Sequence, residues 1–544
     1  MKSKHWQASY GTVPAEINPD AYASVTLMMD EAMQRFADKP AFRCAGQTLS
    51  YAQIDKLSRD FAAYLQGPLG VKKGDRIAVM MPNLLAFPIA FLGIARAGAV
   101  QVNVKPLYTP RELEHQLNDA GVQTIVVYGG VSAMVAEVMS RTGLKTVVTV
   151  GVGDGSGKVL PSPPVDARLK GATAFTDALA QGAPLSFTPV DLKGDDLVFL
   201  QYTGGTTGLS KGAALSHRNL IANTEQFKAF MPEALRPGEE VIVTAIPLYH
   251  IFALMVNFLT YFSVGAESWL VANPRVMDGF VEVLTQAKPS IFMGVNTLYA
   301  GLTLHPRIVE VDFSNLRLSG GGGSAVVGPT SAKWKAITGN FIREGYGLSE
   351  TSPVVSFNPA SIQDFNGTTG LPLPGTDLKL LNDYGDEVAH GESGEVCVKG
   401  PQVMRGYWNQ PEANATAFTA DGYFRTGDVG VITPEGFLKI VDRKKDMVLV
   451  SGFNVFPNEI EAVASACPGV AECACIGVAD ERTGEAVKLF VVKVPSATLT
   501  AEELIAHCRK EMTAYKVPKT VVFVDALPKS TVGKILRREL RTVA

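Results

Sequence analysis

The stretch from Tyr202 to Gly212 has the residue types that could hold a polyphosphate. It follows 196–201, an apolar run that predicts a short buried strand, so its glycines stand where a strand ends and the backbone must turn. Glycine allows positive φ and brings backbone N–H groups close to a ligand, while Thr and Ser hydroxyls and the Lys211 ammonium supply further donors. The stretch therefore predicts a phosphate-binding loop rather than a flexible surface linker.

This loop does not fit the Walker A pattern. In G-x-x-x-x-G-K-[ST], a hydroxyl residue follows the lysine and binds Mg²⁺. Here Ser210 precedes Lys211, and Gly212 follows it. An ordinary P-loop nucleoside triphosphatase is therefore disfavoured.

Length and composition describe a globular protein with more than one domain. The 544 residues exceed what a single core usually supports, and 46% of them are apolar against 19% charged. The net charge of -3 argues against a nucleic-acid binder, which would normally carry a basic face.

The cysteines and the N-terminal residues indicate a cytoplasmic protein. The six cysteines form no C-x-x-C pair and have no histidine at zinc spacing, so we expect reduced, mostly buried thiols. Residues 1–20 are polar and show no signal peptide. The apolar run 84–95 is broken by Pro88 and Gly93 and is shorter than the roughly 20 residues of a membrane span. Peripheral contact with the inner membrane stays open.

Strand and helix patterns alternate in the first part of the chain. Amphipathic helices are predicted after Ser24 and Ser50, a buried helix after Asn83, and a loop over 153–165. The predicted strands are 76–81, 100–104, 124–128 and 145–152. This alternation predicts an α/β fold with a mostly parallel sheet covered on both faces.

A long apolar tract follows the predicted strand 241–246. It runs through Pro247 to His250 and on to Val264, and 291–295 adds further apolar surface. The tract fits a buried core or the lining of a tunnel for an apolar substrate, and both interpretations stay open.

The residue pattern changes after Thr376, where short segments of alternating apolar and polar residues predict strands of a more antiparallel lobe. Roughly the last hundred residues have the size of a small domain. The charge run 442–446 lies between two predicted strands. Taken alone it indicates a solvated turn, although it is also a natural joint between domains.

Several motifs, in order, resemble those of the adenylate-forming superfamily, and within it the bacterial long-chain fatty acid CoA ligases. The motifs are Tyr202 to Gly212, Pro247 to Leu254, Glu344 to Glu350, Tyr423 to Asp428, Asp442 to Asp446 and Pro528 to Lys534. The resemblance implies a large N-terminal domain over 1–441 with βαβ sheets and a smaller β lobe, a hinge at 442–446, and a small mobile α+β lid over 447–544.

The resemblance also implies a reaction in two steps. A fatty acid carboxylate attacks the α-phosphate of ATP to give an acyl-adenylate and pyrophosphate, and the thiol of coenzyme A then displaces AMP. Mg²⁺ is the implied cofactor, with ATP and coenzyme A as co-substrates, and a homodimer stays open. The alternatives are an acyl-AMP ligase that loads a carrier protein and a non-catalytic nucleotide-binding switch. Glu350 and Lys534 argue against the switch.

The resemblance assigns nucleotide-binding roles to the residues of this chain that match the family's motifs. The resemblance assigns the β- and γ-phosphates to the loop residues Thr203, Gly204, Gly205, Thr206, Thr207 and Lys211. It assigns Mg²⁺ to Glu350 and the α-phosphate to Ser349. Adenine is assigned to Tyr346 on one side and to the backbone of Gly321, Gly322 and Gly323 on the other, and the ribose hydroxyls to Asp428 and Arg443. Gly347 is assigned as a further nucleotide-binding residue.

Further roles concern the lid and the acid. Lys534 matches a lysine that bridges the carboxylate and the α-phosphate, which suits a point charge on a flexible stem. Lys445 matches the hinge position, and Gly452 a loop that borders the pantetheine channel. His250 matches a residue near the acyl carboxylate, although a satisfied core histidine fits its position equally.

The chain departs from the family pattern in places. Lys105 stands where Asn is usual, Ser324-Ala325 replace a residue followed by Pro, and Tyr423 and Arg425 replace common Trp and His. None of these changes removes a charge or a hydroxyl that the mechanism needs.

Overall fold

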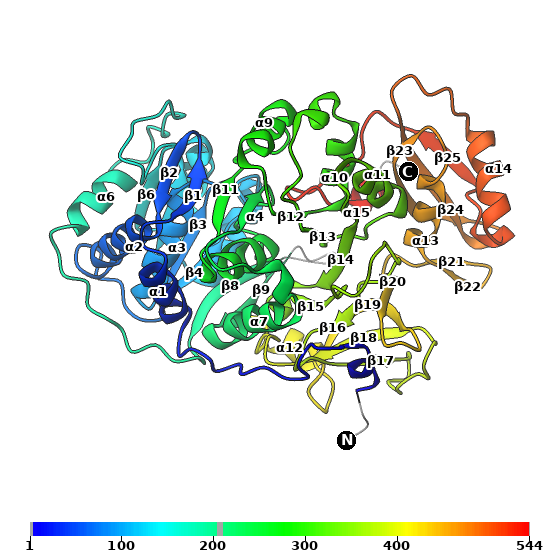
Figure 1. The fold of residues 1–544 in the computed structure, drawn as a ribbon, viewed down its shortest axis with the longest axis horizontal. Helices are drawn as coiled ribbons and strands as arrows, with labels where there is room; N and C mark the ends of the chain where they lie inside the picture. Colours follow the sequence, from blue (N-terminus) through cyan, green and yellow to red (C-terminus); the bar gives the residue numbers. More distant parts are fainter. Residues whose placement is uncertain (1–3, 204–209, 543–544) are drawn as a thin grey trace.

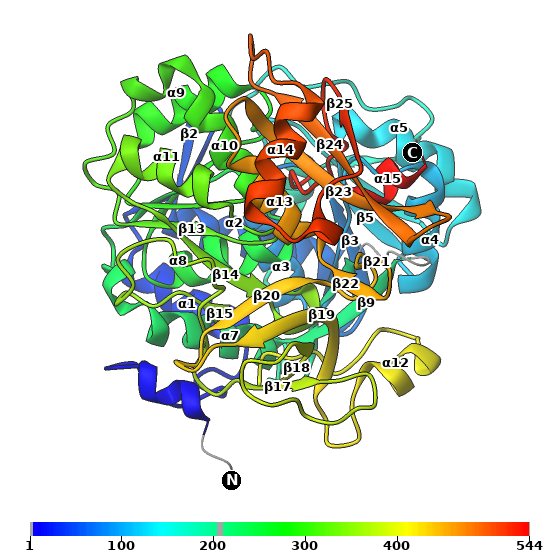
Figure 2. The same ribbon diagram turned by 90° about the vertical axis from the view of Figure 1, so that its right-hand side faces the viewer.

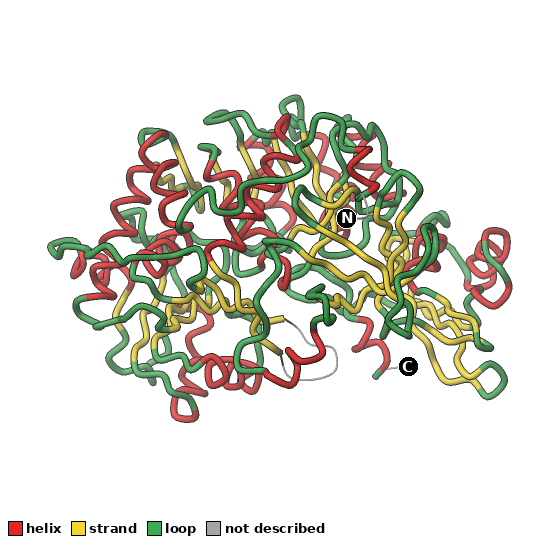
Figure 3. Tube along the Cα trace, turned by 90° about the horizontal axis from the view of Figure 1, so that it is seen from below, coloured by secondary structure: helices red, strands yellow, loops and turns green. Residues whose placement is uncertain are grey.

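The computed structural model describes residues 4–203 and 210–542. Over these residues the strands form four sheets, which we number by their first appearance below. Helices and strands alternate through most of the molecule (Figure 1), and the view from below shows helices on both sides of strands (Figure 3). The predicted α/β class is confirmed.

The first sheet has seven strands, parallel except for the last pair. In spatial order they are β7 (Thr173–Ala174), β6 (Thr146–Val150), β5 (Thr124–Tyr128), β3 (Arg76–Met80), β4 (Val100–Asn103), β8 (Leu197–Thr203) and β9 (Lys211–Ser216). Strands β8 and β9 are antiparallel neighbours, so the two ends of the predicted phosphate loop leave the sheet side by side.

The second sheet has nine strands and a parallel centre. In spatial order they are β16 (Leu371–Pro372), β15 (Val354–Phe357), β14 (Ile342–Gly347), β13 (Leu318–Gly321), β12 (Ile291–Gly294), β10 (Val241–Thr244), β11 (Glu267–Leu270), β1 (Pro40–Cys44) and β2 (Gln47–Ser50). The carboxyl ends of β10, β12, β13 and β14 meet at one edge, where ligands bind in open α/β sheets.

Two smaller sheets complete the molecule. The antiparallel third sheet contains β17 (Asp377–Leu381), β18 (Gly394–Lys399), β19 (Phe424–Ile432) and β20 (Leu438–Arg443). The fourth contains β22 (Phe453–Val455), β21 (Val448–Val450), β24 (Gly484–Lys493), β23 (Val470–Asp480) and β25 (Thr520–Phe523). Figure 2 shows the fourth sheet in orange above the yellow third sheet.

The helices connect and cover these sheets. The α-helices are α1 (Val25–Arg35), α2 (Tyr51–Gln66), α3 (Ala86–Arg96), α4 (Pro110–Ala120), α5 (Ser132–Val138), α6 (Phe175–Gly182), α7 (His217–Phe230), α8 (Tyr261–Ser263), α9 (Met277–Ala287), α10 (Asn296–Leu304), α11 (Gly328–Thr338), α12 (Pro411–Ala417), α13 (Pro457–Ser465), α14 (Ala501–Glu511) and α15 (Arg537–Arg541). Short 3₁₀ helices are η1 (His5–Ser9), η2 (Gly129–Val131), η3 (Met139–Arg141), η4 (Pro232–Ala234), η6 (Pro306–Glu310), η7 (Ser349–Thr351) and η8 (Ala514–Lys516), and η5 (Ala253–Thr260) is a π-helix.

Helix starts follow the predicted caps. The Ser24 and Ser50 hydroxyls accept from backbone N–H groups three residues on, at 3.3 and 3.2 Å. The Gln53 side-chain oxygen in turn accepts from the Ser50 N–H at 2.8 Å, which completes a capping box. The predicted loop 153–165 contains no helix or strand.

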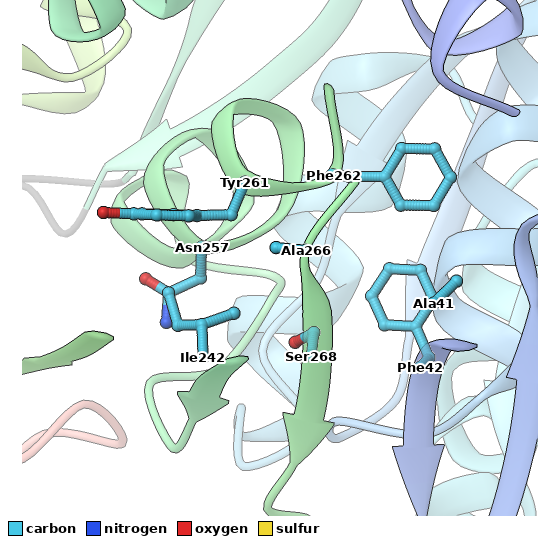
Figure 4. A pocket seen from close by; sticks show the side chains of 8 residues that line it. All are labelled: Ala41, Phe42, Ile242, Asn257, Tyr261, Phe262, Ala266 and Ser268. Atoms are coloured by element: carbon cyan, nitrogen blue, oxygen red, sulfur yellow. The ribbon is translucent and has the colours of Figure 1, made fainter. Parts of the chain in front are cut away.

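One core joins the two large sheets. Phe91 of α3 lies 5.1 Å from Phe199 of β8 and 5.5 Å from Phe258 of the π-helix, between ring centroids. Leu254 and Met293 have no exposed area, so the apolar tract after His250 packs as core. Figure 4 shows a small cavity beneath the π-helix, where Asn257 and Tyr261 lie on one side and the rings of Phe42 and Phe262 on the other.

Two expectations from composition can be compared with the structure. All six cysteines are free and buried, as predicted. Within residues 4–203 and 210–542, none of the helices has the length and apolar character needed to cross a membrane.

Candidate functional site

The described ends of the phosphate loop lie together. Thr203 pairs with Lys211 across β8 and β9, and the Thr203 hydroxyl is 3.5 Å from the Lys211 carbonyl oxygen. The Lys211 ammonium lies 5.4 Å from the centroid of the Tyr407 ring. Four predicted ligands, Gly204, Gly205, Thr206 and Thr207, fall in 204–209, outside the described residues.

Tyr407 connects this loop to Glu350. Its hydroxyl donates to Glu350 Oε1 at 2.8 Å, and the Met404 N–H donates to the Glu350 carbonyl at 2.7 Å. Burial raises the pKa of Glu350, while the Tyr407 hydrogen bond and Arg443 lower it. Glu350 is only 8% exposed, and Tyr407 connects its buried carboxylate to Lys211 of the loop.

A second cluster lies where β14, β19 and β20 meet. The Tyr346 hydroxyl donates to Asp428 Oδ2 at 2.6 Å, and Arg443 Nε lies 3.2 Å from Asp428 Oδ1. Asp428 and Arg443 are directly paired across β19 and β20, and Asp428 is only 4% exposed. The predicted adenine and ribose residues are therefore in contact, although far apart in sequence.

Three predicted nucleotide-site glycines, Gly347, Gly322 and Gly323, stand where the backbone is close-packed or turns. A Cβ on Gly347 would lie 2.1 Å from the Pro353 carbonyl oxygen, so no larger residue fits without a backbone shift. Gly323 has φ +76°, and Gly322 donates to the Gly294 carbonyl at 3.3 Å. The buried Glu344 carboxylate accepts from the Val326 N–H at 3.1 Å, which fixes the end of this glycine run.

His250 begins the helical turn that leads into the π-helix. Its Nδ1 accepts from the Phe252 N–H at 3.3 Å, and its carbonyl accepts from the Leu254 N–H at 3.0 Å. Burial, with the nearby Lys105 and Lys534 charges, lowers the pKa of His250 to about 3. The imidazole is therefore neutral at neutral pH and is not a cationic carboxylate ligand.

Asn83 holds the segment before His250. Its amide donates to the carbonyls of Thr244 and Ile246 at 2.9 and 3.1 Å, and its oxygen accepts from the Leu248 N–H at 2.7 Å. Asn83 belongs to no motif recognised in the sequence, because its role depends on contacts with residues about 160 positions away.

Lys534 lies in a tight turn that reaches into the large domain. The Ser530 N–H donates to the Lys534 carbonyl at 2.7 Å, and the Thr297 hydroxyl donates to the Gly533 carbonyl at 2.8 Å. Figure 1 shows this red segment near the ends of β12 and β13. Burial, followed by the charge of Arg443, lowers the pKa of Lys534 to about 8, while Asp428 acts in the opposite direction.

In the charge run 442–446, Lys444 and Lys445 lie exposed in a turn, as the run suggests in isolation, but Asp442 is buried. Asp442 is 1% exposed and accepts from Arg537 at 3.0 Å and from the Asn458 N–H at 2.8 Å. Arg537 also binds both oxygens of Glu461, at 2.9 and 2.7 Å. Lys444 pairs with Asp383 at 2.6 Å. Since β20 and β21 belong to different sheets, the chain changes sheet directly after this run.

Three predicted residues remain, Lys445, Gly452 and Ser349. Lys445 is exposed in the turn between β20 and β21. Gly452 turns the chain between β21 and β22 with φ +83°, and a Cβ there would touch nothing within 4 Å. Ser349 is partly buried at the start of η7, directly before Glu350.

Tyr407, Thr297 and Arg537 were not among the predicted site residues. Each makes contacts between segments that are distant in sequence: Tyr407 with Glu350, Thr297 with Gly533, and Arg537 with Asp442 and Glu461. A single polar or aromatic residue leaves no periodic signal that could identify such a contact.

Glu350 fits a magnesium ligand of the kind that shares its ion with a substrate. Among the residues that the structure describes, no three His, Cys, Asp or Glu side chains gather into a ready-made metal site. Mg²⁺ in phosphate chemistry is usually held by one or two carboxylates together with substrate phosphates and water. A single buried carboxylate beside the phosphate loop matches that donor set.

An apolar cavity of about 250 Å³ lies at the carboxyl ends of β3, β5 and β11. Its lining residues include Leu84, Tyr128, Leu270, Val276 and Phe280. Pro82 and Leu84, on either side of Asn83, also line it, so it lies beside the loop that supports the segment before His250. Such a lining suits a hydrocarbon chain.

Comparisons with known proteins place this geometry in a family. The model of the AMP-binding enzyme matches residues 29–408, and that of the AMP-binding enzyme C-terminal domain matches 459–534.

Named relatives and a solved structure match over nearly the whole chain. A long-chain-fatty-acid–CoA ligase of Salmonella typhimurium (strain LT2) is 48% identical over 99% of this chain and 98% of its own. One from Bacillus subtilis (strain 168) is 35% identical over the same shares. The crystal structure of the anthranilate CoA ligase AuaEII in complex with anthranoyl-AMP superposes with a TM-score of 0.87 at 25% identity, covering 98% of both chains. The chain belongs to the AMP-binding enzyme family.

Proposed function

We propose that this protein is an ATP-dependent ligase that joins medium- or long-chain fatty acids to coenzyme A through an acyl-adenylate. AMP and pyrophosphate are the other products. The observation that carries the proposal is the 48% identity, over 99% of the chain, to a protein named long-chain-fatty-acid–CoA ligase. The described clusters supply the donors and cations that such a reaction requires.

ATP would span the two clusters. Thr203 and Lys211, with residues 204–207, would bind the β- and γ-phosphates. Tyr346 and Gly347 on one side and Gly322 and Gly323 on the other would enclose the adenine. The contact between Asp428 and Arg443 supports a ribose site, because a buried carboxylate can accept from two adjacent hydroxyls.

Glu350 would hold Mg²⁺ together with phosphate oxygens. The bound ion would supply positive charge that neutralises the phosphates. The Tyr407 hydrogen bond supports this role, since it fixes one carboxylate oxygen at 2.8 Å and so orients the group.

In the first step, the acid's carboxylate oxygen would bond to the α-phosphorus while the bond to the bridging oxygen of pyrophosphate breaks. Negative charge then increases on the α-phosphate oxygens, where Lys534 and the Ser349 hydroxyl would stabilise it. The neutral His250 would orient the acid by hydrogen bonding rather than act as a base, since a pKa of about 3 makes its imidazole only weakly basic.

In the second step, the thiol sulfur of coenzyme A would attack the acyl carbon and AMP would leave. We assign this step to a lid over 447–544 that turns about 442–446 relative to 1–441. The change of sheet between β20 and β21 supports that division. Lys445 would serve the hinge, and Gly452 would border the pantetheine channel.

The proposal is tested with the purified protein, ATP, Mg²⁺ and fatty acids of increasing length, with and without coenzyme A. We expect acid-dependent AMP and a coenzyme A-dependent thioester, with a maximum among the medium- or long-chain acids. Adenylate without any thioester would favour the alternative, an acyl-AMP ligase that loads a carrier protein. A cytoplasmic location, peripheral contact with the inner membrane and a homodimer stay predictions.

A further inference from the structure

Lys105 has no role in the mechanism above, although its segment enters the site beside the phosphate loop. β4 and β8 are parallel neighbours, and Asn103 is paired with Gln201. Lys105 lies two residues after Asn103, and Thr203 lies two residues after Gln201. The two segments therefore leave the sheet side by side.

Polar contacts fix this segment on both sides of the loop. The Asn103 amide donates to Gln201 Oε1 at 2.9 Å, and Gln201 donates to the Tyr249 carbonyl, next to His250, at 3.1 Å. From α4, His115 Nε2 lies 2.9 Å from the carbonyl oxygen of Ser210, at the other end of the loop. The segment containing Lys105 is thus held between the loop and His250.

The Lys105 ammonium lacks a counter-ion of its own. Within the described part of the chain it makes no hydrogen bond or ion pair, and it lies 5.3 Å from the Tyr108 ring centroid. The carboxylate whose charge acts on Lys105 is Glu112, which already accepts hydrogen bonds from the Thr109 N–H and hydroxyl at 2.9 Å. The other charged group that acts on Lys105 is Arg538, from the C-terminal segment.

The surroundings therefore carry an excess of positive charge. Lys105 and Lys534 both act on His250, and Lys211 begins β9 beside Thr203. Burial of a cation such as Lys105 without a paired anion is unfavourable unless an anion binds beside it. Phosphate oxygens would supply such an anion.

We propose that Lys105 is a further phosphate-binding residue, whose ammonium donates hydrogen bonds to phosphate oxygens of ATP and of the pyrophosphate product. The inference rests on the proposed function for the identity of the nucleotide. Coenzyme A also carries phosphates, so the experiment must separate the two sources.

The test compares wild type with Lys105→Asn and Lys105→Arg. Asn is the usual residue at this position in the resembling family, so the first variant is expected to fold. Three quantities are measured: the dissociation constant of magnesium pyrophosphate by calorimetry, the KM for ATP in acid-dependent ATP–pyrophosphate exchange, and the KM for coenzyme A with supplied acyl-AMP.

We expect Lys105→Asn to weaken pyrophosphate binding and raise the KM for ATP by roughly tenfold, with a smaller change in kcat. Lys105→Arg should recover most of the affinity because it keeps the charge. The KM for coenzyme A should not change. Lys170→Asn, at an exposed lysine, serves as the matched control.

Unchanged pyrophosphate affinity in Lys105→Asn would overturn the proposal, and a raised KM for coenzyme A alone would assign the lysine to that substrate instead. A failure of the proposed function is distinguishable, because a wild type that forms no adenylate can still be compared with its variants in pyrophosphate binding.

Discussion

Lys534 is the residue that we assign to only one of the two steps. Its turn is attached to the large domain through Thr297, and its ammonium acts on Asp428 and Arg443. In the role that we propose, it would reach the α-phosphate only while the C-terminal segment is docked as observed.

Lys534→Ala should therefore lose adenylate formation by about a hundredfold or more, as expected when a charged transition-state contact is removed. Thioester formation from supplied acyl-AMP should stay within a few-fold of wild type. Adenylate formation is measured as acid-dependent ATP–pyrophosphate exchange, and the second step as acyl-CoA formed from supplied acyl-AMP. Lys529→Ala, which removes only the partner of Glu472, is the matched control. Equal loss of both steps would contradict the assigned role.

The ionisation of Lys534 predicts the pH dependence of the first step. Its pKa of about 8 in the free protein means that the ammonium is present below this pH and is lost above it. The kcat/KM for ATP should therefore fall roughly tenfold per pH unit above about pH 8. Lys534→Arg, if active, should remove that fall because Arg stays charged. A profile that is flat to pH 10 in wild type would be inconsistent with this account.

The chemical residue types could be found from sequence, but their contacts could not. Glu350, Asp428, Arg443 and Lys534 stand in recognisable motifs. Tyr407 stands in none of them, and only the folded chain shows that it binds Glu350. The low pKa of His250 is likewise unreadable from sequence, because its cause is burial next to two lysines.

At the scale of elements, the turn from β14 into η7 joins two residues that we assign to the nucleotide, Tyr346 and Ser349. Gly347 ends β14, and the Pro353 carbonyl oxygen occupies the space that its Cβ would take.

Gly347→Ala should lower stability by about 1–3 kcal/mol, the usual cost of overpacking, and should raise the KM for ATP. Chemical unfolding and ATP–pyrophosphate exchange measure the two effects. Gly339→Ala is the control: its φ of +76° imposes strain of about 1 kcal/mol, but a Cβ there meets nothing within 4 Å. If both variants behaved alike, close approach at Gly347 would not matter.

Most elements could be predicted because their local signals agree. Ser24 and Ser50 predict helix starts at Val25 and Tyr51, and the predicted strand 124–128 matches β5. The π-helix Ala253–Thr260 could not be predicted, since every one of its residues is buried and the apolar tract has no periodicity. Its conformation is set by packing on both sides.

At the scale of the molecule, Arg537 attaches the C-terminal segment to the residues that follow β20. It joins Asp442 to Glu461, so the segment that carries Lys534 and the predicted hinge are tied together. We expect these parts to move as one body when the lid turns.

Arg537→Ala should destabilise the C-terminal domain by about 3–5 kcal/mol, because it leaves buried carboxylates without their partner. Arg541→Ala, at a more exposed pair with Asp446, should cost at most about 1 kcal/mol. Thermal unfolding of the full chain measures both. If Arg537→Ala lowered stability no more than Arg541→Ala, the ion pairs of Arg537 with Asp442 and Glu461 would be unimportant for the stability of the C-terminal domain.

A parallel sheet and a separate antiparallel lobe could be anticipated from sequence, whereas the burial of Asp442 could not. Alternating strand and helix patterns predict parallel pairing without showing that it is divided between two sheets, and the short alternating strands after Thr376 predict the third sheet. Asp442 is buried because Arg537 and Asn458 converge on it, and no local pattern indicates such partners.

The central claim is that one protein forms acyl-AMP and then transfers its acyl group to coenzyme A. The most direct measurement is the stoichiometry of products from one saturated long-chain acid, with all nucleotides and thioesters quantified by mass spectrometry. The account predicts equal amounts of AMP, pyrophosphate and acyl-CoA, with no ADP. Release of ADP, or accumulation of acyl-AMP without acyl-CoA when coenzyme A is present, would contradict it.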